Sequence, residues 1–181
     1  MRAREVTARR YAKALFQAAR EAGAAEAVGT ELAAFQEALA AFPQVRAVLA
    51  RPWIKPVDRR GIALAIAEKT GAGRLARNLA GLIAERGRID HLPEIVAGYR
   101  ALLDEALGQA RVEVRTRVAL GPEVSRQLAA RLGQMLGKRV LLEERVDQTM
   151  LGGFIARVGS FILDGSLDGQ LARMRERLAG G

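Results

Sequence analysis

The chain lacks cysteine altogether and has a single histidine, His91, among its 181 residues. Without cysteine it can form neither a disulfide framework nor a thiolate site, and one histidine cannot build a metal site that needs several. No stretch reaches the run of about 18 apolar residues that is typical of a membrane-spanning helix. The N-terminal segment MRAREVTARRYAKALF has no apolar block of the kind found in secretory signals. These absences favour a bacterial cytoplasmic protein.

Aromatic residues are also scarce, at 4%, although half of the chain is hydrophobic. The core is therefore expected to be aliphatic, with alanine allowing elements to pack closely. The length suits one domain or two small ones. Trp53, which lies between Pro52 and Pro56, is expected in a loop that packs against the rest of the protein.

Negative charge is in the minority, because 20 acidic side chains stand against 29 basic ones and leave a net charge of +9. Such an excess suggests nucleic acid or another anionic surface as a partner. The longest basic runs are pairs, such as Arg9-Arg10 and Lys138-Arg139, and the excess is spread along the whole chain. An even spread is not the pattern of a binding stripe, so a basic nucleic-acid-binding protein is kept as the alternative function.

Residues 1–105 show the apolar period of amphipathic helices. Six apolar stripes follow one another, separated by glycine or proline, and they begin at Tyr11, Val28, Val45, Ile62, Leu75 and Leu92. Short connections between helices of this kind predict neighbours that pack side by side. We therefore expect a six-helix bundle over residues 1–105.

The period changes from helix to strand near Gly108. In QARVEVRTRVAL the apolar side of a strand is formed by Val112, Val114, Thr116 and Val118. A helical stripe follows from Val124 to Met135, and a second strand begins at Val140. The expected fold class is thus α+β in two domains, with a small α/β domain of a few strands and two helices over residues 106–181.

The stretch VDQTMLGGFIARVGSFILDGSL has more glycine than any other part of the chain. Two extended runs joined by Gly159-Ser160 predict a β-hairpin with a two-residue turn. Gly152-Gly153, just before the first run, indicates a bulge or a close backbone approach. Asp164-Gly165-Ser166 then begins a helix with the stripe Leu167, Leu171, Met174 and Leu178. Such a stripe more often packs inside its own domain than forms an interface.

No catalytic or phosphate-binding pattern is found. A dinucleotide fingerprint is missing, and the nearest approach to a P-loop, Gly133–Lys138, is one residue short and is followed by Arg139 instead of serine or threonine. That segment is better explained as a helix that ends at Gly137. His91 follows Asp90 at the start of a helix, and no serine lies in a G-x-S-x-G elbow. We expect no catalytic residue, cofactor, metal or small-molecule substrate.

Three segments, taken in order, resemble the delta subunit of the F-type ATP synthase, the bacterial relative of the oligomycin-sensitivity-conferring protein. They are Arg10–Phe16 (RYAKALF), the segment from Asn78 to Tyr99 that contains ERGR, and the glycine-rich stretch with its LGG, RVG and DGS motifs. Together they span nearly the whole chain. Two departures from the family pattern stand out, Ser160 in place of a frequent aspartate and Thr116-Arg117 in place of a common Ser-Ala pair.

The resemblance implies a non-catalytic stator connector, which links the F1 head to the peripheral stalk so that rotor torque drives proton-coupled ATP synthesis. Residues 1–105 would bind the N-terminal helix of the alpha subunit of the head, and residues 106–181 would bind b-type stalk subunits. The chain would act as a monomer within a hetero-oligomeric complex, peripheral to the cytoplasmic face of the bacterial cell membrane, without nucleic acid as a partner. We expect the head helix to lie in a groove between the first and fifth helices, formed by Ala8, Tyr11, Ala14, Leu15, Ala18, Asn78, Leu79, Leu82 and Ile83.

Overall fold

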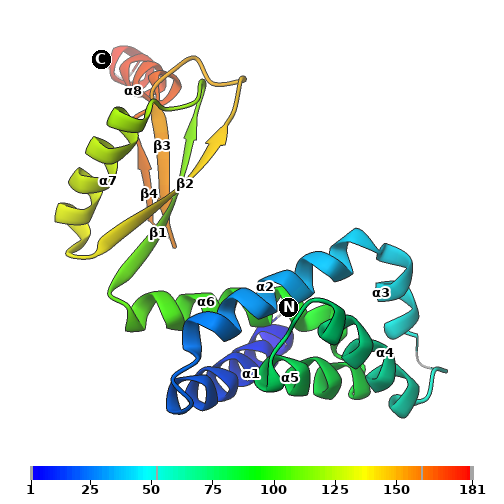
Figure 1. Cartoon of the computed structure of the whole chain (residues 1–181). Helices are drawn as coiled ribbons and strands as arrows, with labels where there is room; N and C mark the ends of the chain where they lie inside the picture. The colour runs from blue at the N-terminus through cyan, green and yellow to red at the C-terminus, as the bar shows by residue number, and fades with distance from the viewer. Residues whose placement is uncertain (1, 52, 160, 180–181) are drawn as a thin grey trace. The chain divides into compact units, whose positions relative to one another are not determined.

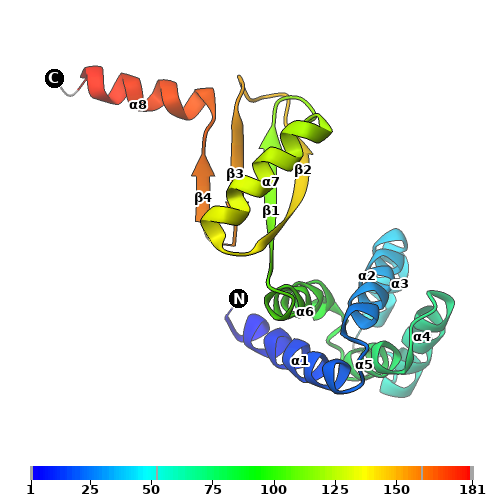
Figure 2. The same cartoon turned by 60° about the vertical axis from the view of Figure 1, so that its left-hand side comes forward.

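The computed structural model describes residues 2–51, 53–159 and 161–179. The chain divides into two compact units, Met1–Leu103 and Asp104–Gly181. Helices make up the first unit, and a sheet with two helices makes up the second (Figures 1 and 2). The mixed α+β fold class predicted from the sequence is confirmed.

The first unit consists of helices joined by short turns. Their bounds are α1 (Arg2–Glu21), α2 (Ala25–Ala41), α3 (Pro43–Leu49), α4 (Pro56–Lys69), α5 (Arg74–Glu85), the single 3-10 turn η1 (Ile89–His91) and α6 (Leu92–Ala106). Gly23, Gly71 and Gly87 adopt positive φ angles just after α1, α4 and α5. Glycine tolerates this conformation without a steric cost, so it ends a helix and turns the chain.

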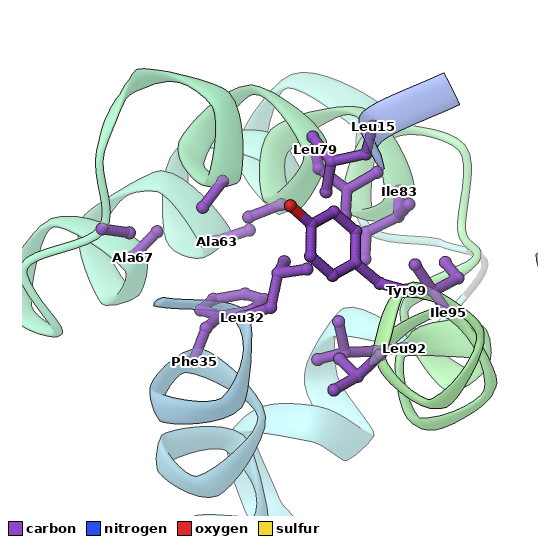
Figure 3. Close-up of a cluster of buried hydrophobic side chains, with 14 of the residues drawn as sticks. Leu15, Leu32, Phe35, Ala63, Ala67, Leu79, Ile83, Leu92, Ile95 and Tyr99 are labelled. Carbon is purple, nitrogen blue, oxygen red and sulfur yellow. The ribbon is translucent and has the colours of Figure 1, made fainter. Parts of the chain in front are cut away.

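Tyr99 lies at the centre of an aliphatic core in the first unit (Figure 3). Its side chain is fully buried and surrounded by leucine, isoleucine and alanine side chains, and the Phe16 ring packs edge-on against it at 5.6 Å. The Tyr99 hydroxyl donates a 2.8 Å hydrogen bond to the Ala25 carbonyl. Burial, and secondarily the charge of Glu31, raises the pKa of Tyr99 to about 12. The phenol therefore stays protonated and ties α6 to the first turn of α2.

A four-stranded sheet forms the second unit. Its strands are β1 (Gln109–Thr116), β2 (Arg139–Val146), β3 (Phe154–Val158) and β4 (Phe161–Asp164), and they lie in the order β2-β1-β3-β4. β1 and β2 are parallel and are connected through α7 (Pro122–Leu136), whereas β3 is antiparallel to both β1 and β4. The helix α8 (Leu167–Ala179) follows β4.

The core of the second unit is small. It is centred on the buried side chains Val112, Val114, Leu132 and Ala156. Thr116 is also buried, but Val118 lies beyond the end of β1 and is exposed. The predicted strand face is therefore correct up to Thr116 and wrong at Val118, because the chain leaves the sheet before that residue.

The apolar stripe of α8 is only partly covered by its own domain. Leu167, Leu171, Met174 and Leu178 are between 46% and 82% exposed, and α8 extends away from the sheet in Figure 2. The expectation that this stripe packs inside the domain is wrong. The single helix α7 already covers the buried face of β1, and α8 leaves the sheet at its edge strand.

Candidate partner-binding surfaces

The glycines of the stretch from Val146 to Leu167 allow two backbone segments to approach closely. Gly153 has a φ of +79°, and a Cβ atom there would meet the Gly165 carbonyl and lie 2.9 Å from the Cα of Ser166. A Cβ atom on Gly152 would lie 2.9 Å from the Leu167 side chain. The predicted close approach is confirmed. These glycines let the segment before β3 pack closely against the residues at which α8 begins.

The β-hairpin predicted in the same stretch is present. Val158 pairs with Phe161, and Gly159 has a φ of +57°. The turn residue Ser160 lies outside the described residues. Gly137 also fulfils its prediction, since it ends α7 with a φ of +62° and its N–H bonds the Gly133 carbonyl. The segment that comes nearest to a P-loop is thus a helix end.

Hydrogen bonds fix the beginning of α8, which we call the α8 root and define as Leu151–Gly153 together with Asp164–Gly169. Ser166, which is 2% exposed, caps the helix by accepting the Gly169 N–H at 3.0 Å. Asp164 Oδ1 accepts the Ser166 hydroxyl at 2.6 Å and its N–H at 2.9 Å. These bonds to Ser166 hold the pKa of Asp164 below its ordinary value.

Further hydrogen bonds tie the loop before β3 to the same root. Asp168 Oδ2 accepts the Leu151 N–H at 3.0 Å, and the Leu167 N–H bonds the Gly152 carbonyl at 3.0 Å. The Gly165 N–H bonds the Phe154 carbonyl, also at 3.0 Å. The first turn of α8 is therefore attached both to the end of β4 and to the segment that leads into β3.

The nine residues predicted for the head-binding groove divide into two layers. α1 and α5 pack together, as the prediction requires. Four of the residues lie in the core of the first unit and offer no contact surface, namely Ala8, Leu15, Leu79 and Ile83. The other five are half-buried or exposed, and we call them the α1–α5 face: Tyr11, Ala14, Ala18, Asn78 and Leu82.

One partner of this face was missed by sequence reasoning. The Arg88 guanidinium donates a 2.9 Å hydrogen bond to the Tyr11 hydroxyl, and its carbon lies 5.8 Å from the centre of the Tyr11 ring. A cation held over an aromatic ring is attracted to the π face. Arg88 lies 77 residues away in the chain, so no local pattern pairs it with Tyr11. It holds the aromatic side chain in place at one part of the face.

A second apolar surface lies elsewhere in the first unit, between α2, α3 and α4. It is a hollow of about 470 Å³ lined by Ala38, Leu39, Phe42, Val45, Ile62, Ala65, Ile66, Lys69 and Thr70. In the loop between α3 and α4, Trp53 is 72% exposed, with the Arg51 guanidinium 5.2 Å from its ring. The expected packing of Trp53 on the rest of the protein is wrong. Its ring contacts the Arg51 guanidinium of the same loop instead.

The second unit exposes apolar side chains on β4 as well as on α8. Phe161 is 79% and Leu163 is 43% exposed. The register pairs Leu163 with Ala156, which belongs to the core, so both side chains point to the same side of the sheet. The apolar surface of this edge strand thus extends past the part that α7 covers.

Among the described residues, no group of three or more His, Asp or Glu side chains is placed to hold a metal ion. No helix in the described part of the chain is long and apolar enough to cross a bilayer.

A hollow of about 250 Å³ lies on the open face of the sheet, and it is lined by Glu113, Arg115, Ile155, Arg157, Ile162 and Asp164. Two of its charged side chains form ion pairs, with Glu113 3.4 Å from Arg145 and Arg115 3.9 Å from Asp147.

Comparison with known proteins agrees with the resemblance found in the sequence. The family model described as ATP synthase delta (OSCP) subunit matches residues 7–178. A protein named ATP synthase subunit delta from Syntrophobacter fumaroxidans is 34% identical over 97% of this chain and 96% of its own. One of the same name from Anaeromyxobacter dehalogenans is 39% identical over 94% and 96%.

The fold also has a solved counterpart. A chain of the mitochondrial ATP synthase hexamer of Toxoplasma gondii superposes with a TM-score of 0.70, over 95% of this chain and 97% of that one. The two sequences are only 19% identical. The likeness shows that the fold is shared across a large sequence distance.

Proposed function

We propose separate binding roles for the two units of this chain, which belongs to the ATP synthase delta (OSCP) subunit family and is therefore a non-catalytic stator component of that enzyme. The first unit, which corresponds to the helical bundle predicted over residues 1–105, binds the F1 head. The second unit, residues 106–181, binds the b-type subunits of the peripheral stalk. A part of this kind needs two binding surfaces and no active site, and the alternative of a basic nucleic-acid-binding protein is not retained.

The α1–α5 face is proposed to bind the N-terminal helix of the alpha subunit. Its alanines, Ala14 and Ala18, leave room for another helix to approach closely, and Tyr11 and Leu82 form larger side walls. Asn78 is exposed and can fix the register of a bound helix by hydrogen bonding. The arrangement suits a helix that inserts apolar side chains at i, i+3, i+4 and i+7.

The energy of this contact comes mainly from the bound helix. Because the protein side offers small residues, the incoming leucine-sized side chains would be the ones that lose most water-exposed area. Each such side chain contributes about 1.5–3 kcal/mol when fully buried. Three or four of them support tight binding after the cost of association is subtracted. The core residues beneath the face keep it rigid, so little ordering is needed on binding.

The exposed stripe of α8 carries the proposal for the stalk. Leu167, Leu171, Met174 and Leu178 recur at intervals of three or four residues and so share one face of the helix. In the described structure about half or more of each of these side chains is left exposed by its own unit. A contiguous exposed apolar face of this kind marks an interaction site, and the helical stalk subunits are the partners that family membership indicates.

Within the assembled enzyme the chain is proposed to be a monomeric, peripheral component at the cytoplasmic face of the bacterial membrane. Its family places it in a membrane-associated complex, and the curated relatives compared above are bacterial. Linking the head and the stalk through one chain also raises the effective concentration of each binding site for its partner.

One titration tests both roles. The purified chain is mixed with a peptide of the alpha-subunit N-terminal helix and with the soluble segment of the stalk subunits, separately and together. We expect each ligand to bind and a ternary complex to form. Competition between the two ligands, or binding of neither, would contradict the assignment. A matched titration with double-stranded DNA checks the discarded alternative, which predicts binding that weakens steeply with salt.

A further inference from the structure

The hydrogen bonds of the α8 root have no evident role in the core of the second unit. That core is built around Val112, Val114 and Leu132, whereas the root lies at the edge of the sheet and holds a helix whose apolar side is exposed. A helix with so little packing would ordinarily fray, because isolated helices of this length are marginal in water. What keeps α8 formed and directed is therefore its attachment at the N-terminal end.

Three features of the attachment act on the helix together. Ser166 satisfies the Gly169 N–H, which is one of the amides left without a partner in the first turn of a helix. Asp164 fixes the Ser166 hydroxyl through its own carboxylate. Asp168, inside the first turn, binds the Leu151 N–H and so prevents that turn from rotating away from the loop before β3.

The glycines make these bonds possible. Any side chain at Gly153 would meet the Gly165 carbonyl, and one at Gly169 would meet the Asp164 carboxylate. The LGG and DGS motifs are therefore two halves of one structure, although they are separated by the whole β3–β4 hairpin. The first half attaches the helix to the loop before β3, and the second half caps the helix and joins it to the end of β4.

We propose that Ser166, together with Asp164 and Asp168, is a positioning network that orders α8 and aims its apolar stripe at the stalk before binding. The inference rests on the proposed stalk contact and adds to it the residues that set its affinity without touching the partner. Pre-ordering lowers the entropy that the helix would otherwise lose on binding. Disruption of the network should therefore weaken stalk binding while every apolar contact residue stays in place.

The main experiment uses Ser166→Ala in the full-length chain, with Ser125→Ala as the matched control. Ser125 is a half-buried serine of α7 and takes no part in the hydrogen bonds of the root described above. Two quantities are measured, the hydrogen exchange of the α8 amides in the free chain and the Kd for the soluble stalk segment. Loss of a serine cap typically costs the equivalent of a 5- to 10-fold change. We expect α8 exchange to accelerate and the Kd to rise by about that factor in Ser166→Ala, with neither changed in Ser125→Ala.

The outcomes separate the network from the stalk contact. Unchanged α8 exchange in Ser166→Ala, or faster exchange with an unchanged Kd, would overturn the positioning role. If a chain that lacks residues 166–181 binds the stalk normally, the stalk contact itself fails, whatever the exchange data show. If Ser166→Ala unfolds the second unit, Asp168→Ala serves instead, since it removes the bond to the Leu151 N–H and leaves the Ser166 cap in place. Asp168→Ala must then accelerate α8 exchange and weaken binding, and failure of either would refute the proposal.

Discussion

Replacing Ala14 with aspartate should weaken head binding strongly without unfolding the first unit. Ala14 is exposed on α1, so in the free protein the new carboxylate remains in water. The cost to folding is then that of helix propensity, roughly 0.6 kcal/mol. This is small beside the 5–15 kcal/mol that holds a typical domain together. The thermal unfolding curve of the first unit should therefore change little.

The same carboxylate becomes costly once a helix covers the α1–α5 face. An unpaired charge at an interface typically costs about 2–5 kcal/mol. Because the face is open to solvent at its edges, we expect the lower part of this range, about 2–3 kcal/mol. That corresponds to a Kd that rises roughly 30- to 150-fold. The measurement is a fluorescence-anisotropy titration with the alpha-subunit peptide, accompanied by circular dichroism.

Two alanines of the same unit provide matched controls. Ala97→Asp places the same charge on an exposed position in the middle of α6, and Ala65→Asp places it in the hollow between α2, α3 and α4. Both should bind the peptide as the unmodified chain does. Normal binding by Ala14→Asp, or its unfolding, would refute the proposed face. A loss confined to Ala65→Asp would move the head helix to the hollow instead.

Three further predictions concern stability. Gly153→Ala should destabilise the second unit by about 2–3 kcal/mol in chemical denaturation, since it combines a positive φ with a backbone collision. The control Gly137→Ala, with a similar φ but open space around its Cβ, should cost about 1 kcal/mol. Equal losses of stability in the two variants would disprove the collision. Because the folded pKa of Tyr99 is raised to about 12, its contribution to folding stability is fully present below the ordinary tyrosine pKa of about 10 and is lost as the pH rises towards 12. Urea unfolding at increasing pH should show this loss of stability in the native chain and not in Tyr99→Phe. Because the folded pKa of Asp164 is lowered by its bonds to Ser166, its contribution to folding stability is present above the ordinary carboxylate pKa of about 4 and is lost as the pH falls below it. The hydrogen exchange of the α8 amides, corrected for intrinsic rates, should therefore accelerate below that pH. Exchange rates that do not change with pH would contradict the assignment.

Periodicity predicted which residues share a face, and in the first unit that was nearly sufficient. Most of the apolar stripes found there do enter one core, because several helices cover one another from all sides. Glycine positions were equally informative. Gly137 and Gly159 predicted a helix end and a hairpin turn, and both residues adopt positive φ angles that other residues avoid.

What covers a face does not follow from periodicity. The stripes of α7 and α8 have the same pattern as those of the first unit, yet Met135 and Leu178 are mostly exposed. The pairing of Tyr11 with Arg88 could not be predicted from the sequence for a different reason, since the two residues are 77 positions apart. Four of the nine groove residues were assigned to a contact surface although they lie in the core. An alanine or leucine at a stripe edge and one at its centre look alike in a sequence.

The attachment of α8 has a mechanical consequence. The strands β3 and β4 are antiparallel, so the beginning of β3 and the end of β4 lie at the same end of the hairpin. The α8 root grips both, through Leu151–Gly153 on one side and Asp164 on the other. A pull on α8 is therefore shared by two neighbouring strands. Were α8 attached to β4 alone, the edge strand would bear the whole force.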